Sequence, residues 1–230
     1  MTIHEYEIVS INVGKPKTLV FEGKELSTGI YKKPVHEPVF LSFLNFESDG
    51  QADLVHHGGK DKAVCVYPYD HYAYWEKELG RELEAAAFGE NLTVKGLVEE
   101  DVCIGDMFQL GEAIVQVSQP WQPCYKLAKK YNVEDLPLRV QNTGYTGFYF
   151  RVLKEGWVTR ESRLQLLSRH PLGITVSFAN HIMYHDKYNQ EGIERILGVQ
   201  ELSESWRTTL LKRLKNMETD EKHSKNGSTI

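Results

Sequence analysis

The feature that most constrains the fold is a series of short β-type runs separated by glycine turns. The clearest case is DVCIGDMFQLGEAIVQVSQP, where Gly105-Asp106 and Gly111-Glu112 interrupt apolar runs and predict a meander with tight turns. Further runs rich in β-branched and aromatic residues predict strands at Tyr6 to Val13, Thr18 to Phe21, Val39 to Phe46, Val64 to Val66, 147–153 and 163–168. Many short strands and few helices favour a mainly β fold built on a closed or nearly closed barrel.

The pattern changes near His170-Pro171, where helical spacing replaces the β-type runs. Three short helices are predicted at 175–186, 190–197 and 203–216, with Thr175 and Ser203 as N-caps and Gly198 as a stop. We therefore expect three parts, which are a β-barrel domain over residues 1–168, a three-helix unit over 169–216 and a disordered polar tail over 217–230. One more helix is expected after Pro68, because Tyr72, Trp75 and Leu79 lie at helical spacing.

Composition narrows the class of protein. The formal net charge is −5 and the basic residues are scattered, so we expect no long face for nucleic acid. No run approaches the roughly 20 apolar residues of a membrane helix, and the first residues lack a signal pattern. Three cysteines are too few for a disulfide framework and fit a reducing compartment, so we expect a cytoplasmic protein.

Cys124 is the strongest candidate for chemistry. It follows a predicted strand in SQPWQPCYK, where Pro120 and Pro123 are expected to interrupt the strand and stiffen a loop. The nearby cation Lys126 favours a thiolate, which is a nucleophile and a soft metal ligand. The alternative is a small buried side chain, and that interpretation suits Cys65 and Cys103, which lie inside apolar strands.

The segment VHHGGKDKA is a second candidate. Gly58 and Gly59 permit a close approach of the backbone to a ligand, and Lys60 and Lys62 add positive charge, so the turn could bind an anion. His56 and His57 are neighbours whose side chains would point to opposite faces of a strand, so they are poorly placed to bind one metal. A solvated basic turn remains the alternative.

Two polar, glycine-bearing segments complete the set of candidates. FGENL contains Asn91, and RVQNTGYTG contains Arg139, Asn142 and Thr143. Each is predicted to be a loop that could hydrogen-bond a heterocycle or a phosphate, and each is also compatible with a plain turn. The chain has no CxxC, HExxH, GxGxxG, GxSxG or Walker motif, which argues against structural zinc, zinc proteases, Rossmann domains and serine hydrolases.

Taken in order, the strings VHHGGKDKA, FGENL, GD and QPWQPC resemble the MOSC domain, named after the C-terminal domain of molybdenum cofactor sulfurases. The chain is most similar to the bacterial stand-alone branch linked to resistance against 6-hydroxylaminopurine, in which a three-helix unit follows the barrel. The resemblance covers roughly residues 5–215.

The resemblance implies a molybdenum cofactor, which is molybdopterin carrying molybdenum, with Cys124 as the ligand of the metal. It places His57 and Lys60 beside that cysteine as catalytic residues, with His57 suited to deliver protons. The residues expected to contact the cofactor are His56, Gly58, Gly59, Asn91, Arg139, Asn142 and Thr143.

The implied activity is reduction of small N-hydroxylated substrates to amines. Because the chain shows no flavin or iron–sulfur motif, the electrons are expected from an external donor, a flavin-containing reductase, with no membrane or nucleic acid involved. Two alternatives stay open. One is a carrier of molybdenum cofactor or of sulfur as a Cys124 persulfide, and the other is a metal-free thiol transferase.

Overall fold

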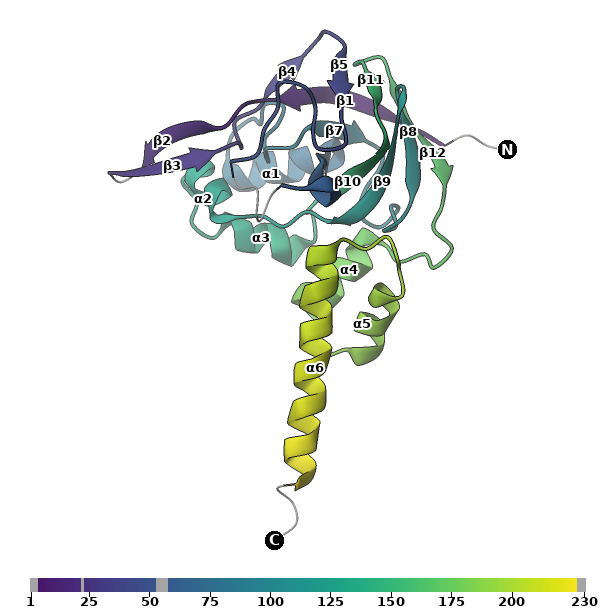
Figure 1. The fold of residues 1–230 in the computed structure, drawn as a ribbon. Helices are drawn as coiled ribbons and strands as arrows, with labels where there is room; N and C mark the ends of the chain where they lie inside the picture. The colour runs from purple at the N-terminus through teal and green to yellow at the C-terminus, as the bar shows by residue number, and fades with distance from the viewer. Residues whose placement is uncertain (1–3, 22, 53–57, 227–230) are drawn as a thin grey trace.

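The computed structural model describes residues 4–21, 23–52 and 58–226, with the side chains of the last helix described as far as residue 219. Seven strands in this part of the chain form a barrel (Figure 1). Their spatial order is β12 (Arg163–Ser168), β8 (Met107–Leu110), β9 (Ala113–Pro120), β10 (Phe148–Lys154), β6 (Val64–Pro68), β7 (Leu92–Lys95) and β1 (Glu5–Val13). Pairing of β1 with β12 closes the barrel, and β4 (Lys33–Val35) adds to the far end of β1. The predicted mainly β barrel with a helical C-terminal part is confirmed.

The barrel interior is filled by aliphatic side chains and a small group of phenylalanines. Phe108, Phe148 and Phe150 contact one another with ring centroids 5.4–5.6 Å apart. Every residue of β6 is buried, because one face of the strand points into the barrel and the other lies under helices. This burial on both faces explains why the strand has no polar alternation in its sequence.

Three short helices cover the outer face of β6 and β10. They are α1 (Tyr72–Leu79), α2 (Tyr125–Tyr131) and α3 (Leu136–Thr143), and they enclose a second apolar cluster that includes Trp75, Phe88 and Trp121. Left-handed residues end these helices at Gly80, Asn132 and Gly144. The site described below lies between this layer and the barrel wall.

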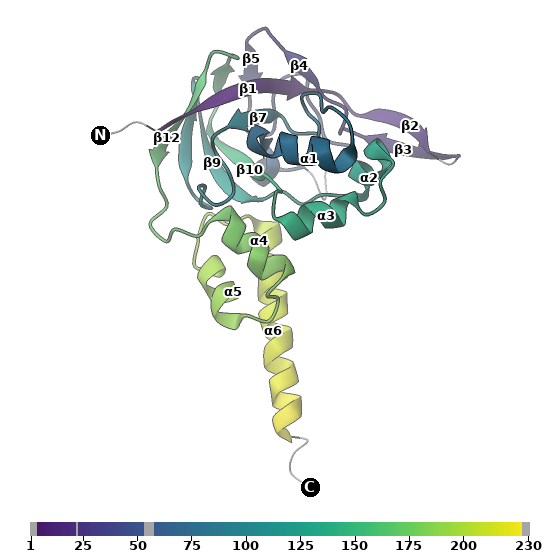
Figure 2. The same ribbon diagram turned by 180° about the vertical axis from the view of Figure 1, so that it is seen from behind.

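Two small sheets decorate the barrel. The hairpin of β2 (Lys17–Phe21) and β3 (Lys24–Thr28) projects from one side, and Figures 1 and 2 both show it next to α2. The second sheet pairs β5 (Val39–Leu41) with β11 (Gly156–Val158). The strand predicted to run to Phe46 stops at Leu41, because Ser42 starts a turn in which its N–H and its hydroxyl both donate to the carbonyl of Asn45.

The C-terminal unit contains α4 (Val176–Tyr184), α5 (Gln190–Leu197) and α6 (Glu204–Asn226). It packs against one end of the barrel, and α6 runs away from it (Figure 2). The Thr175 hydroxyl caps α4 as predicted by accepting the N–H of Phe178, and the structure adds Asn189, which caps α5 by accepting the N–H of Gly192. The unit has its own apolar core around the buried Trp206.

Two predictions about local structure are wrong. The segment with Arg139, Asn142 and Thr143 is part of α3 and not a loop, because Pro137 fits the first turn and the left-handed Gly144 ends the helix. The tail predicted to be disordered from residue 217 continues as α6 to Asn226, since neither glycine nor proline interrupts the chain before Gly227.

In the described part of the chain, each helix is too short or too polar for a membrane span.

Candidate functional site

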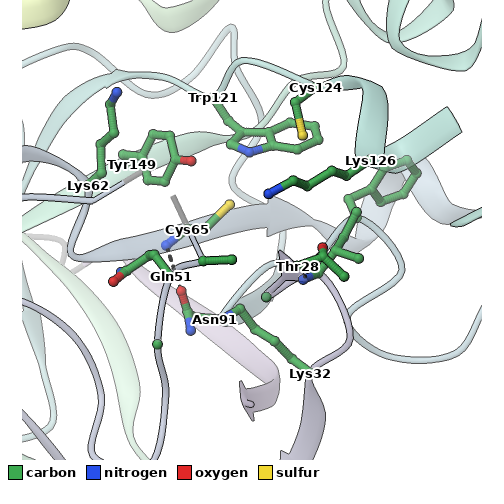
Figure 3. Close-up of a pocket in the computed structure, with 16 residues that line it drawn as sticks. Thr28, Lys32, Gln51, Lys62, Cys65, Asn91, Trp121, Cys124, Lys126 and Tyr149 are labelled. Carbon is green, nitrogen blue, oxygen red and sulfur yellow. Dashed lines mark hydrogen bonds between the residues drawn. The ribbon is translucent and has the colours of Figure 1, made fainter. Parts of the chain in front are cut away.

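A cavity of about 90 Å³ lies on the outer side of the barrel wall, where the base of the β2–β3 hairpin faces the start of α2. Figure 3 shows side chains from these elements converging on it. The lining residues are Thr28, Gly29, Ile30, Lys32, Gly50, Gln51, Ala52, Lys62, Cys65, Phe88, Gly89, Asn91, Trp121, Cys124, Lys126 and Tyr149. The lining therefore joins segments that are far apart in the sequence, including two cysteines.

Cys124 is placed at the wall of the cavity by the junction between β9 and α2. Pro120 is the last residue of β9, so the expected interruption of the strand comes one residue later than predicted. Cys124 then has an extended backbone, and its carbonyl accepts the N–H of Leu127 as α2 begins. The thiol is partly exposed, unlike those of Cys65 and Cys103. A partly exposed thiol beside a cavity is accessible to a ligand.

The cavity favours anions. Its lining, as described, includes Lys32, Lys62 and Lys126 and no Asp or Glu. The ammonium of Lys126 points into the cavity, whereas Lys62 stands beside Tyr149 at its edge (Figure 3). Lys32 forms a buried ion pair with Asp49. The Lys126 ammonium therefore contributes a positive potential that attracts an anionic group.

Asn91 lines the cavity, but protein groups already use most of its hydrogen-bonding capacity. Its amide nitrogen donates to the carbonyl of Asn12 at 3.1 Å and to the carboxylate of Asp49 at 2.8 Å. Its side-chain oxygen accepts the N–H of Cys65 at 3.1 Å. An amide offers two N–H donors, so only the oxygen can still accept a hydrogen bond from a ligand. Asn91 thus mainly fixes the wall of the cavity.

Flat and apolar side chains form the rest of the wall. Trp121, Phe88 and Tyr149 are buried and leave only small parts of their surfaces to the cavity. Burial raises the pKa of the Cys65 thiol well above its ordinary value, and Glu90 raises it further, so Cys65 is a neutral thiol. Cys65 therefore lines the site, although its apolar sequence context predicted only a buried structural side chain.

The segment from Gly58 to Lys62 in VHHGGKDKA, here called the glycine–lysine turn, lies only partly at this cavity. His56 and His57 fall outside the described residues, so their predicted roles stay predictions. Gly58 and Gly59 are not among the lining residues, and Lys60 borders a separate shallow hollow that also includes Arg151. Lys62, which was not singled out as a site residue, is the part of the turn that reaches the Cys124 cavity.

The structure does not bring the three predicted residues of α3 to the cavity. Arg139 is paired with Asp135 on the protein surface, Asn142 is exposed, and the Thr143 hydroxyl donates to the carbonyl of Val140. Their side chains are used by the surface and by the helix itself. Of the residues that do line the cavity, the sequence had indicated Cys124 and Asn91 as site residues and Lys62 and Lys126 as nearby positive charges.

The described side chains alone do not form a metal site here. Among the described residues, no three His, Cys, Asp or Glu side chains are grouped so that they could hold an ion. A metal at Cys124 would therefore need most of its ligands from a cofactor.

Comparisons with known proteins identify relatives for both the barrel and the C-terminal helices. A model of the MOSC domain matches residues 53–165, and a model of the YiiM-like, 3-alpha helix domain matches residues 174–216. The protein YflK of Bacillus subtilis is 60% identical over 213 residues, which cover 93% of this chain and 96% of YflK.

Two further proteins extend the comparison. The crystal structure of YiiM from Geobacillus stearothermophilus matches with a TM-score of 0.79 and 45% identity, over 91% of this chain and 99% of that one. A protein of Gibberella moniliformis named Reductase is 36% identical over 151 residues, which cover 64% of this chain and 27% of that protein. These matches span both the barrel and the helices, and the chain belongs to the family of MOSC-domain proteins that carry a YiiM-like 3-alpha helix domain.

Proposed function

We propose that the protein is a molybdenum cofactor-dependent reductase that converts small N-hydroxylated compounds, such as 6-hydroxylaminopurine, to the corresponding amines. The observation that carries the proposal is the accessible Cys124 thiol at a cavity lined by lysines and flat side chains, in a chain of the MOSC family. The relative named Reductase in Gibberella moniliformis supports an oxidoreductase role.

The lining fits the cofactor in its chemistry. A thiolate is a soft ligand that suits a metal already bound by the sulfur atoms of a dithiolene, and Cys124 offers one. Lys126 and Lys62 suit an anionic cofactor with a phosphate group, and Trp121 and Phe88 suit a flat heterocycle. When bound, the cofactor would supply the two-electron redox chemistry that the side chains lack.

The protein groups would bind, orient and protonate the substrate. The net reaction is R–NHOH + 2 e⁻ + 2 H⁺ → R–NH₂ + H₂O, so two protons must reach the site. The family resemblance places His57 beside Cys124, and its imidazole is suited to deliver protons. Lys60 borders a separate hollow in the structure, so Lys126 is the lysine placed to stabilise charge at the cavity. The buried side chains of the cavity wall lower the local dielectric constant, which strengthens each hydrogen bond made to the substrate.

The electrons would come from a separate protein, and a flavin-containing reductase is the class of donor that we propose. The sequence shows no flavin motif, and the described part of the chain has no group of cysteines that could hold an iron–sulfur cluster. The purified, cofactor-loaded protein should therefore show no turnover with reduced pyridine nucleotide alone. Turnover under those conditions would refute the need for a donor.

The test of the function joins metal content to activity. Protein expressed in cells that make the cofactor should contain molybdenum and should reduce 6-hydroxylaminopurine with reduced benzyl viologen as the electron source. Cys124→Ala should lose turnover, whereas Cys103→Ala, which removes a buried thiol outside the cavity lining, should retain it.

The same experiment separates the alternatives. A Cys124→Ala protein that keeps its cofactor and full activity would reject the ligand role of Cys124. A molybdenum-loaded wild type that carries a Cys124 persulfide and reduces no N-hydroxylated compound would indicate a carrier. Activity in protein free of molybdenum would point to a thiol enzyme without a metal.

A further inference from the structure

The hydroxyl of Tyr149 lies at the cavity with its own hydrogen unused. Tyr149 is on β10 and pairs directly with Cys65 on β6, so both side chains leave the barrel wall on the same face. The residue is 6% exposed and lines the cavity. Its hydroxyl points toward the space between the indole of Trp121 and the sulfur of Cys65 (Figure 3).

The hydrogen bonds around this hydroxyl leave one position free. The indole of Trp121 lies beside the Tyr149 hydroxyl (Figure 3) and lowers the pKa of the phenol. A tyrosine hydroxyl has a single hydrogen to donate, and no acceptor for it occurs among the described residues. Buried donors are nearly always satisfied, so a donor that faces a cavity points to a partner in the ligand.

Other polar groups of the lining are less suited to this task. Lys126 carries a full charge and suits the anionic part of a ligand, and the Cys65 thiol is a weak donor. The amide nitrogen of Asn91 is occupied by protein acceptors. Thr28, Gln51 and Trp121 also offer neutral donors, and of these groups the Tyr149 hydroxyl is the one directed toward the space beside the Cys65 sulfur.

We propose that Tyr149 is a catalytic residue that donates a hydrogen bond to the hydroxyl oxygen of the N-hydroxylated substrate and assists its departure as water. The inference rests on the proposed function. The N–O bond breaks and the electron donor supplies two electrons. The oxygen, which already carries one hydrogen, takes up one proton and leaves as water. The nitrogen keeps its hydrogen and takes up one proton from solvent to give the amine. Of the protons on oxygen, one is already present in the N-hydroxyl group and the second comes through Tyr149, which is reprotonated by solvent.

The protonation state of Tyr149 suits this role. Burial raises the pKa of the phenol well above its ordinary value, and the neighbouring thiols Cys65 and Cys124 raise it further, while Trp121 opposes these effects. The phenol therefore keeps its hydrogen at neutral pH, so the donor is present before each turnover.

The experiment compares Tyr149→Phe with wild type by equilibrium binding and by turnover. Affinities for 6-hydroxylaminopurine and for adenine are measured by calorimetry on the oxidised, cofactor-loaded protein without an electron donor. Because both ligands are tested on the same protein, partial loss of folded material cancels in the ratio of affinities. We expect the preference for the N-hydroxylated ligand to fall about fivefold, as one neutral hydrogen bond is lost, and kcat with benzyl viologen to fall about 100-fold.

Tyr67→Phe is the matched control. Tyr67 is also a buried tyrosine, whose hydroxyl accepts the indole N–H of Trp75 at 2.6 Å and donates to the carbonyl of Tyr145 at 2.9 Å, and it does not line the cavity. We expect this variant to melt at a lower temperature and to keep the ligand preference and kcat of wild type.

The outcomes are distinct for the two proposals. A Tyr149→Phe protein with the ligand preference and kcat of wild type would overturn the role of Tyr149 and leave the reductase standing. A fall of the same size in Tyr67→Phe would also overturn it, because the effect would then come from lost packing. A molybdenum-loaded wild type that neither binds nor reduces the N-hydroxylated compound would reject the proposed function itself, and the role of Tyr149 with it.

Discussion

The carboxylate of Asp61 accepts the backbone N–H of Glu204, the first residue of α6, at 3.1 Å. The same carboxylate pairs with Arg151 of β10 at 2.9 Å, and the Asp61 carbonyl accepts the Ser118 hydroxyl of β9. One residue of the glycine–lysine turn thus joins two barrel strands to the C-terminal helices. An acidic side chain at a helix N-terminus is also favoured by the helix dipole.

Replacing Glu204 by proline should weaken this connection. Proline is accepted at the first residue of a helix but lacks the N–H that Asp61 accepts. We expect Glu204→Pro to unfold with about 1.5 kcal/mol less free energy than Glu204→Ala, which removes the same side chain but keeps the N–H. Urea unfolding measures the difference, and equal midpoints for the two variants would show that the bond contributes nothing.

The positive potential at the cavity predicts a preference for anionic reagents at Cys124. Lys126→Met should slow alkylation by iodoacetate about fivefold more than alkylation by the neutral iodoacetamide, because one partly exposed charge near the thiol is removed. Mass spectrometry of the modified peptide separates Cys124 from Cys65. Lys129→Met is the control on the same helix, outside the cavity lining, and a change of equal size there would contradict the assignment.

Lys130 gives a prediction about pH. Its ammonium donates to the carbonyls of Ala86 and Ala87, both at 2.8 Å, and burial lowers its pKa to about 8 while Glu90 opposes the shift. Between pH 8 and the ordinary lysine pKa near 10.5, the unfolded chain binds more protons at this site than the folded one, so stability rises with pH.

The stability of wild type relative to Lys130→Met should therefore increase by about 3 kcal/mol as the pH rises from below 8 to above 10.5. The comparison with the variant cancels the contributions of tyrosines that titrate in the same range. Urea unfolding at several pH values measures it. A difference that is constant or that falls with pH would contradict the lowered pKa.

Glu90 is predicted to stabilise the fold of the FGENL segment and to take no part in the reaction. Its buried carboxylate accepts hydrogen bonds from the hydroxyls of Tyr72 and Thr93 and from the N–H of Phe88. Glu90→Gln places an N–H₂ group against at least one donor, so we expect a loss of about 2 kcal/mol in unfolding free energy. Retained reactivity of Cys124 toward iodoacetamide in the folded variant would agree, and retained stability would contradict the prediction.

The sequence predicts the architecture well because the elements depend on local patterns. Glycine turns between apolar runs mark β8 and β9, and helical spacing with capping residues such as Thr175 and Ser203 marks the C-terminal helices. The helix α3 was missed because Asn142, Thr143 and Gly144 resemble a turn when read alone, although a C-terminal glycine equally well ends a helix.

The site could be predicted only in part, because a cavity depends on contacts between distant segments. Cys124 was found from its proline-flanked position, and the structure places it at the cavity with Asn91. Cys65 and Tyr149 were missed because β6 and β10 are buried on both faces, so no alternation shows which side chains face outward. Lys62 is the residue of the glycine–lysine turn that reaches the cavity. Its position follows from the contacts of Asp61 with distant residues, which the local sequence does not reveal.

The seam between β1 and β12 has a consequence for how the chain is made. Its pairs join Glu5 to Gln165, Tyr6 to Leu164 and Glu7 to Arg163, so residues from opposite ends of the barrel sequence must meet. A ribosome releases the N-terminal strand long before its partner exists. The edge of β1 that pairs with β12 therefore stays unpaired until residues 163–165 have been synthesised, and contacts of this separation form slowly.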